Sequence, residues 1–246
     1  MNRFYYDLHV HSCLSPCGDE DNTPNNILGM SSLNEVDIVA LTDHNTSKNC
    51  PAFFAAAENY GIIPIAGMEL TTSEDIHVVC LFEHLSDAME FDAYVDKNKF
   101  IIKNRPEFFG EQLILDKEDN VIGKEENLLT GATYISIDDA KDIVEKFGGV
   151  AYPAHIDRDS YSIISVLGTI PTDSKFSFFE LHDTDKKQDF SLKYGIKKEK
   201  FIVSSDAHYL TQLKDKENFF ELNCEKSNPD EVRKALFEIL RNNAMQ

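Results

Sequence analysis

The sequence predicts a single α/β domain, folded as a (β/α) barrel or a closely related open sheet. Apolar runs rich in β-branched and aromatic residues alternate with segments of helical pattern through most of the 246 residues. Several of these runs are nearly continuous in apolar residues, which is typical of parallel strands buried on both faces. Histidine or acidic side chains close most of the runs, and catalytic groups gather at the carboxyl edge of such a sheet.

Seven strands are expected to alternate with helices along the chain. The strand candidates are FYYDLHV (4–10), DIVALT (37–42), IIPIAGME (62–69), IHVVCLF (76–82), GGVAYPAH (148–155), FSFFELH (176–182) and KFIVSSDAH (200–208). Helical patterns cover residues 24–34, 50–60, 86–103, 136–147, 186–194 and 229–242. Thr23 before Pro24, and Asn228 before Pro229, each place a capping residue ahead of a proline at the first helical position.

One segment interrupts this alternation. Residues 112–129, QLILDKEDNVIGKEENLL, contain two apolar stretches separated by DKEDN, with Gly123 close behind the second. That pattern predicts a β-hairpin arm. We place the arm in an insertion over about residues 105–133 of one domain that spans residues 1–246. The arm is either a lid that helps to select the substrate or a surface decoration.

The charge of the chain narrows the class of ligand. Its 24 Lys and Arg residues against 43 Asp and Glu residues give a formal net charge of −19. Such a surface disfavours long nucleic acid, whereas two or three divalent cations would reverse the potential within a site and admit a small phosphorylated substrate. A short oligonucleotide remains compatible. No apolar run approaches membrane-spanning length, so no membrane partner and a cytoplasmic location are expected.

The five cysteines are an odd number in a chain that shows no export signal, so a disulfide framework is not expected. Cys13 and Cys17 lie between the first two histidines of the chain and Asp19. Buried or structural thiols are favoured over metal ligation, because a CxxxC pair without a second pair is weak evidence for a metal site.

Metal-binding residue types recur at the ends of the expected strands. His9 and His11 lie two residues apart, so their imidazoles share one face of a strand, and Asp7 would share that face and orient an imidazole. Five separate strand ends carry imidazole or carboxylate, a mixture that suits Zn²⁺, Mn²⁺ or Fe²⁺. One ion takes about four to six ligands, so the whole set implies two or three ions. The candidate ligands are His9, His11, Asp19, His44, Glu69, His77, His155, Asp206 and His208.

Together these motifs resemble the polymerase and histidinol phosphatase (PHP) family. The resemblance rests on DLHVHS with Asp19, LTDH, YPAH and SSDAH in that order, with GMEL and DIHVV between them, and it covers nearly the whole chain. It implies a distorted (β/α)7 barrel of the PHP type with three metal ions at the carboxyl ends of the strands. It assigns His9, His11, Glu69 and Asp206 to one ion, Asp19, His44 and His155 to a second, and Glu69, His77 and His208 to a third. Glu20 and Asp21 compete with Asp19 for its place.

The chemistry expected of this site is hydrolysis of a phosphoester by metal-activated hydroxide, which requires no protein nucleophile. His208 and His155 are candidates to give a proton to the leaving oxygen. Arg158 follows His155 by three residues, and its guanidinium suits bidentate recognition of a phosphate, with Tyr161 as a further donor. The alternative for Arg158 is a surface ion pair with Asp157 or Asp159.

Three functions are therefore compatible with the sequence. The leading expectation is a metal-dependent phosphoesterase that acts on a small phosphomonoester or a nucleotide phosphate. A short-oligonucleotide exonuclease would use the same ions on a phosphate end, and the net charge of −19 disfavours it. A non-catalytic regulatory or binding module would keep the fold and the metal site without hydrolysis.

Overall fold

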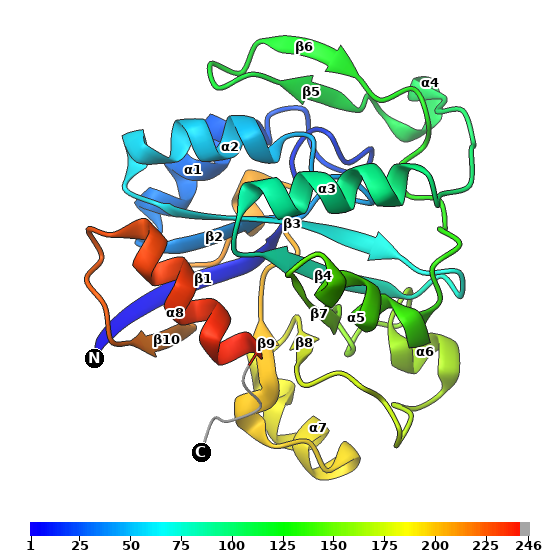
Figure 1. Ribbon diagram of the computed structural model, residues 1–246, viewed down its shortest axis with the longest axis vertical. Helices are drawn as coiled ribbons and strands as arrows, with labels where there is room; N and C mark the ends of the chain where they lie inside the picture. Colours follow the sequence, from blue (N-terminus) through cyan, green and yellow to red (C-terminus); the bar gives the residue numbers. More distant parts are fainter. Residues whose placement is uncertain (242–246) are drawn as a thin grey trace.

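Each of the seven expected apolar runs forms a strand in the computed structural model, which describes residues 1–241. A curled six-stranded sheet in the order β10-β1-β2-β3-β4-β7 lies at the centre (Figure 1). Its strands are β1 (Asn2–Val10), β2 (Ile38–Leu41), β3 (Ile63–Thr71), β4 (His77–Phe82), β7 (Val150–Pro153) and β10 (Phe219–Leu222). β8 (Phe179–Leu181) and β9 (Phe201–Val203) form a separate parallel pair.

The sheet is mixed, which differs from the expectation of parallel strands. β1, β2 and β3 are parallel, but β4 runs antiparallel to both β3 and β7. The cause is the short connection between β3 and β4, closed by a hydrogen bond from the Thr72 amide to the Ile76 carbonyl (2.9 Å). A parallel crossover needs a much longer connection. His77, the first residue of β4, therefore lies opposite Thr71, the last residue of β3, at the edge where β1–β3 end.

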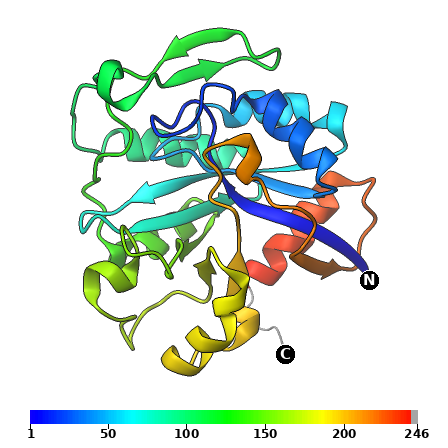
Figure 2. The same cartoon turned by 180° about the vertical axis from the view of Figure 1, so that it is seen from behind.

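Backbone hydrogen bonds continue the sheet around this edge. The Ile156 amide, just after β7, donates to the carbonyl of Glu180 on β8 (2.8 Å). The His11 amide, just after β1, donates to the Ala207 carbonyl beyond β9 (3.0 Å). The β8–β9 pair thus lies between β7 and β1 at the carboxyl edge, and the view from behind shows β9 rising beside β1 (Figure 2). The protein has a mixed α/β fold with a curled, barrel-like sheet.

Helices cover the outer face of the sheet, and one helix covers the lower end of its inner face. The outer layer consists of α1 (Pro24–Leu33), α2 (Cys50–Ala57), α3 (Leu85–Asp96) and α5 (Ile137–Lys146). The last helix, α8 (Pro229–Arg241), packs Val232, Leu236 and Phe237 against the inner-face residues Phe4 and Tyr152. Position 242, where the sequence predicts this helix to end, lies outside the described residues. Among residues 1–241 no helix has the length and apolarity to cross a bilayer.

Helix α3 is shorter than the sequence predicts. α3 ends at Asp96 instead of reaching residue 103, because the following backbone pairs with residues 126–133. The Phe100 amide donates to the Ala132 carbonyl (3.2 Å), and the Leu128 amide donates to the Ile102 carbonyl (2.7 Å). Beyond this base lie the short α4 (Pro106–Phe109) and the antiparallel strands β5 (Leu113–Leu115) and β6 (Val121–Lys124).

Side-chain hydrogen bonds fix the insertion to the edge of the sheet. The Asn49 amide group donates to the Leu113 carbonyl (3.1 Å), and the Asn45 amide group donates to the carbonyls of Leu129 (2.7 Å) and Gly131 (2.8 Å). Asn45 directly follows His44. The loop between residues 129 and 131 is therefore held beside the strand ends. Two further helices, α6 (Ile163–Leu167) and α7 (Lys187–Tyr194), complete the fold.

Candidate metal centre

A β-bulge at the end of β1 determines which way its histidines face. Where β1 pairs with β2, β1 has one extra residue between Asp7 and Val10. Because of this bulge, Asp7 and Val10 point to the same face of the sheet, although residues three apart in a regular strand point to opposite faces. His9 and His11 flank Val10 and face the opposite way. Asp7 instead accepts a hydrogen bond from the Ser205 backbone amide (2.9 Å). The prediction that Asp7 orients an imidazole is wrong for this reason.

Glu180 on β8 takes the role expected of Asp7. Its Oε2 lies 2.8 Å from His9 Nδ1 and accepts a hydrogen bond from the His155 backbone amide (3.0 Å). Because Nδ1 faces this carboxylate, Nε2 is the nitrogen of His9 that faces the cluster. Sequence reasoning missed Glu180. The available signal was a single acid within the apolar run FSFFEL, between two residues that are buried on the outer face.

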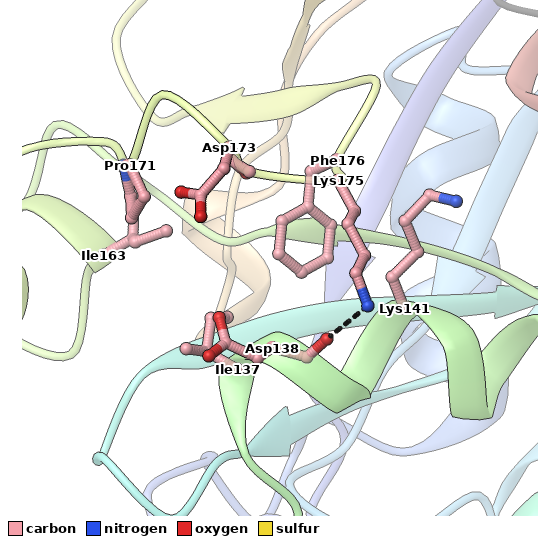
Figure 3. Close-up of a pocket in the computed structure, with 9 residues that line it drawn as sticks. Ile137, Asp138, Lys141, Ile163, Pro171, Asp173, Lys175 and Phe176 are labelled. Atoms are coloured by element: carbon pink, nitrogen blue, oxygen red, sulfur yellow. Dashed lines mark hydrogen bonds between the residues drawn. The ribbon is translucent and has the colours of Figure 1, made fainter.

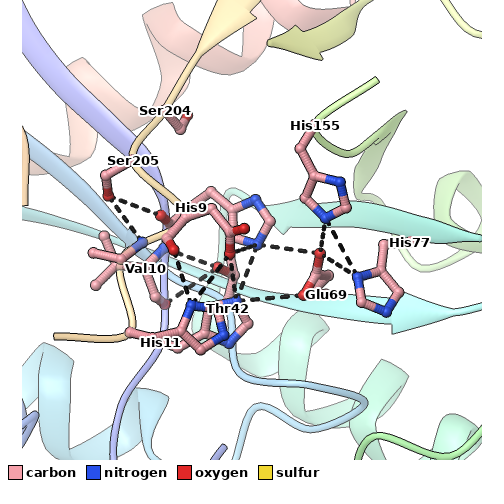
Figure 4. A network of polar contacts seen from close by, with 12 residues as sticks. His9, Val10, His11, Thr42, Glu69, His77, His155, Ser204 and Ser205 are labelled. Atoms are coloured by element: carbon pink, nitrogen blue, oxygen red, sulfur yellow. Dashed lines mark hydrogen bonds and ion pairs between the residues drawn. The ribbon is translucent and has the colours of Figure 1, made fainter. Parts of the chain in front are cut away.

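The carboxylate of Glu69, on β3, lies among five imidazoles (Figure 4). Its Oε1 lies 2.8 Å from His77 Nδ1, 3.0 Å from His155 Nε2 and 3.4 Å from His9 Nε2. Its Oε2 lies 3.0 Å from His44 Nδ1 and 3.3 Å from His11 Nε2. All six side chains are at least nine-tenths buried, so this polar cluster lies at the bottom of the site, away from bulk water.

Asp206 forms the second carboxylate of the cluster. Its Oδ1 lies 3.1 Å from His11 Nε2 and 3.4 Å from His9 Nε2, and its Oδ2 lies 3.0 Å from an Arg158 nitrogen. His208, two residues on, stacks its ring on that of His11 with centroids 4.2 Å apart. The loop after β9 therefore places Asp206 and His208 beside the two histidines at the end of β1.

Three overlapping groups have donor atoms that all lie within 4.8 Å of one another, as ligands of one ion must. Donor separations of about 3 Å are those expected around an ion with metal–ligand distances of about 2.1 Å. Nδ1 of His44 and Oδ1 of Asp206 make no well-oriented hydrogen bond, and their close polar neighbours, Glu69 Oε2 and His11 Nε2, are themselves candidate ligands, so an ion would satisfy these buried atoms. The mixed N/O donor set fits Zn²⁺, Mn²⁺ or Fe²⁺. The groups are His9, His11, Glu69 and Asp206; His44, Glu69 and His77; and His11, His44 and His208.

Asp19 is not brought into this cluster. Its Oδ1 accepts a hydrogen bond from the Asp21 backbone amide (2.9 Å), and its own amide donates to the His208 carbonyl (2.9 Å). Within residues 1–241, neither Asp19 nor its rivals Glu20 and Asp21 belong to any of the three groups. The structure gathers the other eight predicted ligands, with His155 joined to the groups through Glu69.

Burial and neighbouring charges set the protonation of the cluster without ions. Burial disfavours a charged His9, but Glu180, Glu69 and Asp206 outweigh burial and raise the pKa of His9 well above its usual value. Burial lowers the pKa of His44 well below its usual value. Burial alone would raise the pKa of Glu69, yet the surrounding imidazoles hold it well below the usual range. Glu69 therefore stays ionised and offers negative charge to a cation.

Several residues at the site have left-handed backbone conformations that are unusual for side chains other than glycine. The φ angles are 27° for His155, 50° for Asp206, 51° for Asn45 and 54° for Tyr161. Each such conformation costs about 1–3 kcal/mol and persists where the surroundings hold it. Strain of this kind concentrates at functional sites, and here two of the four residues, His155 and Asp206, belong to the cluster.

A cavity of about 350 Å³ opens above the cluster. Arg158 and Tyr161 line it, together with Thr130 from the insertion. Arg158 pairs with Asp206 and lies 3.3 Å from His182 Nδ1, so the ion pair with Asp157 or Asp159 does not form. The Tyr161 ring stacks on His77 with centroids 4.7 Å apart. Arg158 and Tyr161, the two predicted phosphate-binding residues, thus line the cavity whose floor is the histidine and carboxylate cluster.

A second cavity, of about 270 Å³, lies between α5 and the segment that follows α6 (Figure 3). Its two lysines are already paired. Lys175 contacts the Asp142 carboxylate (2.6 Å) and the Asp138 carbonyl (3.2 Å), and Lys141 contacts Glu145. None of the predicted site residues lines this cavity, so the first cavity is the candidate active site.

Comparison with known proteins agrees with the motifs. The family model described as the PHP domain matches residues 7–147, which is more than half of the 246 residues. The chain belongs to the PHP family. The matched region holds the first six predicted ligands of this PHP domain, from His9 to His77. No curated protein sequence matches the chain.

Solved structures share the fold at low sequence identity. A lesion-specific endonuclease Q from Pyrococcus furiosus is 17% identical with a TM-score of 0.64, and endonuclease Q in complex with a 27-mer duplex carrying an abasic lesion at its active site is 18% identical with a TM-score of 0.63. Each match covers 97% of this PHP protein, which spans only 56% and 57% of those chains. A candidate metal-dependent phosphoesterase from Bifidobacterium adolescentis is 15% identical with a TM-score of 0.55, over 94% of this chain and 95% of that one.

Proposed function

We propose that this PHP protein is a metal-dependent phosphoesterase that hydrolyses a small phosphomonoester or a nucleotide phosphate. The observation that carries the proposal is the Glu69 carboxylate, held among five imidazoles on the floor of a cavity whose wall bears Arg158. Anionic and imidazole donors favour divalent cations, and the guanidinium favours an anionic substrate. The likeness to a candidate phosphoesterase over nearly all of both chains supports the same reaction class.

Two or three ions of Mn²⁺, Zn²⁺ or Fe²⁺ fit the donor groups. We assign His9, His11, Glu69 and Asp206 to one ion and His44, Glu69 and His77 to a second, with Glu69 shared between them. Such ions supply Lewis acidity to the phosphate ester and to water when they are bound. His11, His44 and His208 form the third position. This grouping differs from the one that the family resemblance implies, because Asp19 is absent from it and His155 reaches it through Glu69.

The remaining polar residues of the cavity position the substrate. Arg158 would hold the phosphate oxygens, with Tyr161 beside it, opposite the floor of the cavity. Burial lowers the pKa of His208 to about 4, so this imidazole is neutral at neutral pH and is better suited to bind an ion than to give a proton. We therefore assign proton donation to His155, whose Nδ1 has no hydrogen-bond partner.

We also propose that the seven strands β1–β4 and β7–β9 represent the distorted barrel of the PHP type, within one domain. The insertion then serves as a wall of the site. Thr130 lines the cavity, and Asn45 holds the residues on either side of Thr130. These contacts favour the lid interpretation over a surface decoration.

A panel of phosphorylated metabolites, nucleotides and short oligonucleotides, with released phosphate as the readout, tests this function after loading with Mn²⁺, Zn²⁺ or Fe²⁺. We expect at least one ester to be hydrolysed, and we expect His44→Ala to lower the rate by about 100-fold or more, because it removes a ligand from two donor groups. His84→Ala changes an exposed histidine outside the cluster and is the matched control. Absence of hydrolysis in every loaded form, or full activity of His44→Ala, would contradict the proposal.

The end of an oligonucleotide is the second candidate substrate. The stretch from Lys97 to Arg105 contains four cations and no acid; Lys97, Lys103 and Arg105 are exposed, whereas Lys99 is buried and paired with Asp96 and Glu125. Exposed aromatic rings accompany it, and the Arg105 guanidinium lies 4.5 Å from the centroid of the Phe108 ring. Cations beside exposed aromatic rings suit a single strand. The fold is also that of a protein described with an abasic DNA duplex at its active site.

Arg158→Ala is expected to raise KM for the true substrate by about tenfold or more, because a hydrogen bond from a charged donor contributes about 1.5–3 kcal/mol. The turnover number should change less. Arg158 also pairs with Asp206, so metal content must be measured alongside the kinetics. Arg3→Ala, at the start of β1, removes an exposed guanidinium outside the cavity and is the control. An unchanged KM with full metal content would remove Arg158 from the substrate site.

A further inference from the structure

Two cations and an imidazole meet beside the cavity, at the carboxyl edge of the sheet. Arg158 lies in the loop after β7, His182 directly follows β8, and Lys214 lies in the segment between β9 and β10. The Arg158 guanidinium lies 3.3 Å from His182 Nδ1, and the Lys214 ammonium donates to the His182 carbonyl (2.9 Å). Three neighbouring strand ends therefore place donor groups next to the wall that Arg158 gives to the cavity.

The contact with Arg158 determines which nitrogen of His182 can bind an anion. A guanidinium has only donor groups, so Nδ1 of His182 is the acceptor and the proton of the neutral ring lies on Nε2. Partial burial lowers the pKa of His182, and the charges of Arg158 and Lys214 lower it further, so the ring is neutral at neutral pH. The ring is exposed, and its Nε2–H group is a donor open to a ligand.

The acids of this edge do not neutralise these cations. Asp157 is buried, and its two oxygens accept the backbone amides of His182 (2.9 Å) and Asp183 (3.1 Å). Lys187, at the start of α7, is a neighbour of Lys214, whose charge adds to burial in lowering the pKa of Lys187. Within residues 1–241 neither lysine pairs with an acid. Like charges held together in this way attract an anion.

Lys214 is fixed at both of its ends. The Asn34 amide group, at the end of α1, donates to the carbonyls of Leu213 (3.1 Å) and Lys214 (3.3 Å). The ammonium is held by the His182 carbonyl (2.9 Å). A side chain that is already ordered loses less conformational entropy when it binds a ligand.

We propose that Arg158, His182 and Lys214 bind a second phosphate group of the substrate, beside the phosphate ester at the floor of the cavity. The proposal rests on the phosphoesterase function proposed above and names its substrate class, a small ester with two phosphate groups. Nη1 of Arg158 lies 3.0 Å from Asp206 in the cluster, whereas Nη2 faces His182. One guanidinium thus lies between the two phosphates and can contact both.

Lys214 and the Nε2–H group of His182 contact only the second phosphate. Loss of Lys214 should therefore weaken recognition of a bisphosphate and leave a monophosphate unaffected. Arg158 would act on both kinds of substrate. This difference separates a second phosphate position from a general electrostatic effect of the cations on every anionic substrate.

Two pairs of esters that differ by one phosphate test the proposal. They are fructose 6-phosphate with fructose 1,6-bisphosphate, and adenosine 5′-monophosphate with adenosine 3′,5′-bisphosphate, so the preferred pair also separates a sugar from a nucleoside. In the Mn²⁺-loaded protein we expect kcat/KM to be about tenfold higher for the bisphosphate of at least one pair, as a charged hydrogen bond supplies.

Lys214→Gln should reduce this ratio to near one, and Lys214→Arg, which keeps the charge, should retain most of it. Lys216→Gln is the matched control, because the ammonium of Lys216 pairs with Glu35 outside the cavity. The ratio should not change in that variant. The value of kcat/KM for the monophosphate should change less than about twofold in all three variants.

A ratio near one for both pairs in the unmodified protein would overturn the proposal, and so would an unchanged ratio in Lys214→Gln. In a protein that hydrolyses none of the four esters, dissociation constants from calorimetry replace kcat/KM, with the same expected ratios. Failure of the second phosphate position is therefore distinguishable from failure of the proposed function. Hydrolysis without a preference for two phosphates rejects only the second position, whereas tighter binding of a bisphosphate without hydrolysis rejects only the phosphoesterase.

Discussion

Glu69→Gln is expected to lower metal-dependent hydrolysis by about a thousandfold and to reduce the bound metal measured after desalting. Glu69 belongs to two of the three donor groups, so its loss affects two ions at once. Lewis acid stabilisation by bound ions contributes several kcal/mol to the transition state, and a loss of about 4 kcal/mol corresponds to about a thousandfold in rate.

Glutamine keeps the volume of glutamate but replaces an anionic oxygen by an NH₂ group that cannot donate a lone pair to a cation. Both oxygens of Glu69 face imidazole nitrogens at 2.8–3.4 Å, so either orientation of the amide removes a donor from a group. The imidazoles hold the pKa of Glu69 well below its usual range, outweighing burial, so the charge that the substitution removes is present at any pH used for the assay.

Glu58→Gln provides the control, because Glu58 is exposed in the turn after α2. Metal content by elemental mass spectrometry and the rate of phosphate release should stay at the unmodified level in that variant. A Glu69→Gln protein that retains both its ions and its rate would show that the cluster is not the catalytic centre.

The strand ends, and with them most of the candidate centre, could be predicted from the sequence. Buried runs such as IIPIAGME leave little choice of element, since a short, continuous apolar run flanked by polar turns fits a buried strand. Parallel strands present their carboxyl ends at one edge, so His44 and Glu69 had to meet once β2 and β3 paired. Residues that close such runs were therefore predictable as a group.

What the sequence did not reveal depends on local geometry that has no signature in composition. The bulge in β1 turns Asp7 away from His9, and periodicity of two cannot anticipate an extra residue. The hairpin between β3 and β4 reverses the strand that carries His77 but leaves His77 at the same edge. The assignment of Asp19 as a ligand stays a prediction, because Asp19 lies in a loop, where a side chain has no period, and its carboxylate is bound to the Asp21 amide outside the three donor groups.

Glu180 illustrates a different limit. A single acid in an apolar run can be a solvated edge residue or a buried partner, and sequence periodicity does not separate the two. The structure shows that Glu180 is a buried partner, because it contacts His9 and the His155 amide on the inner face of the sheet. Both contacts are distant in sequence. A pairing between residues 171 positions apart is a property of the closed sheet alone.

Glu180→Ala is expected to destabilise the metal-free protein by about 4 kcal/mol, because removing one partner from a buried charged pair leaves the other without compensation. For a chain of this size such a loss lowers Tm by roughly 8–16 °C. The His9 ring and the His155 amide would each lose their acceptor, and both are buried. Glu217→Ala, at an exposed glutamate before β10, should leave Tm unchanged.

Glu180→Gln separates the charge from the hydrogen bonds. Both donors converge on Oε2, and Oε1 has no partner, so the amide oxygen of glutamine can accept both while its NH₂ group occupies the unpartnered position. Stability should therefore fall much less than in Glu180→Ala.

The carboxylate also makes the His9 imidazole a stronger ligand, and loss of such a partner typically weakens metal binding by about 10–100-fold. Competition with a chelator measures that affinity. Equal metal affinity in Glu180→Gln and the unmodified protein would show that the charge of Glu180 does not strengthen His9 as a ligand. Equal Tm values for the alanine and glutamine variants would show that its hydrogen bonds to His9 and to the His155 amide do not stabilise the fold.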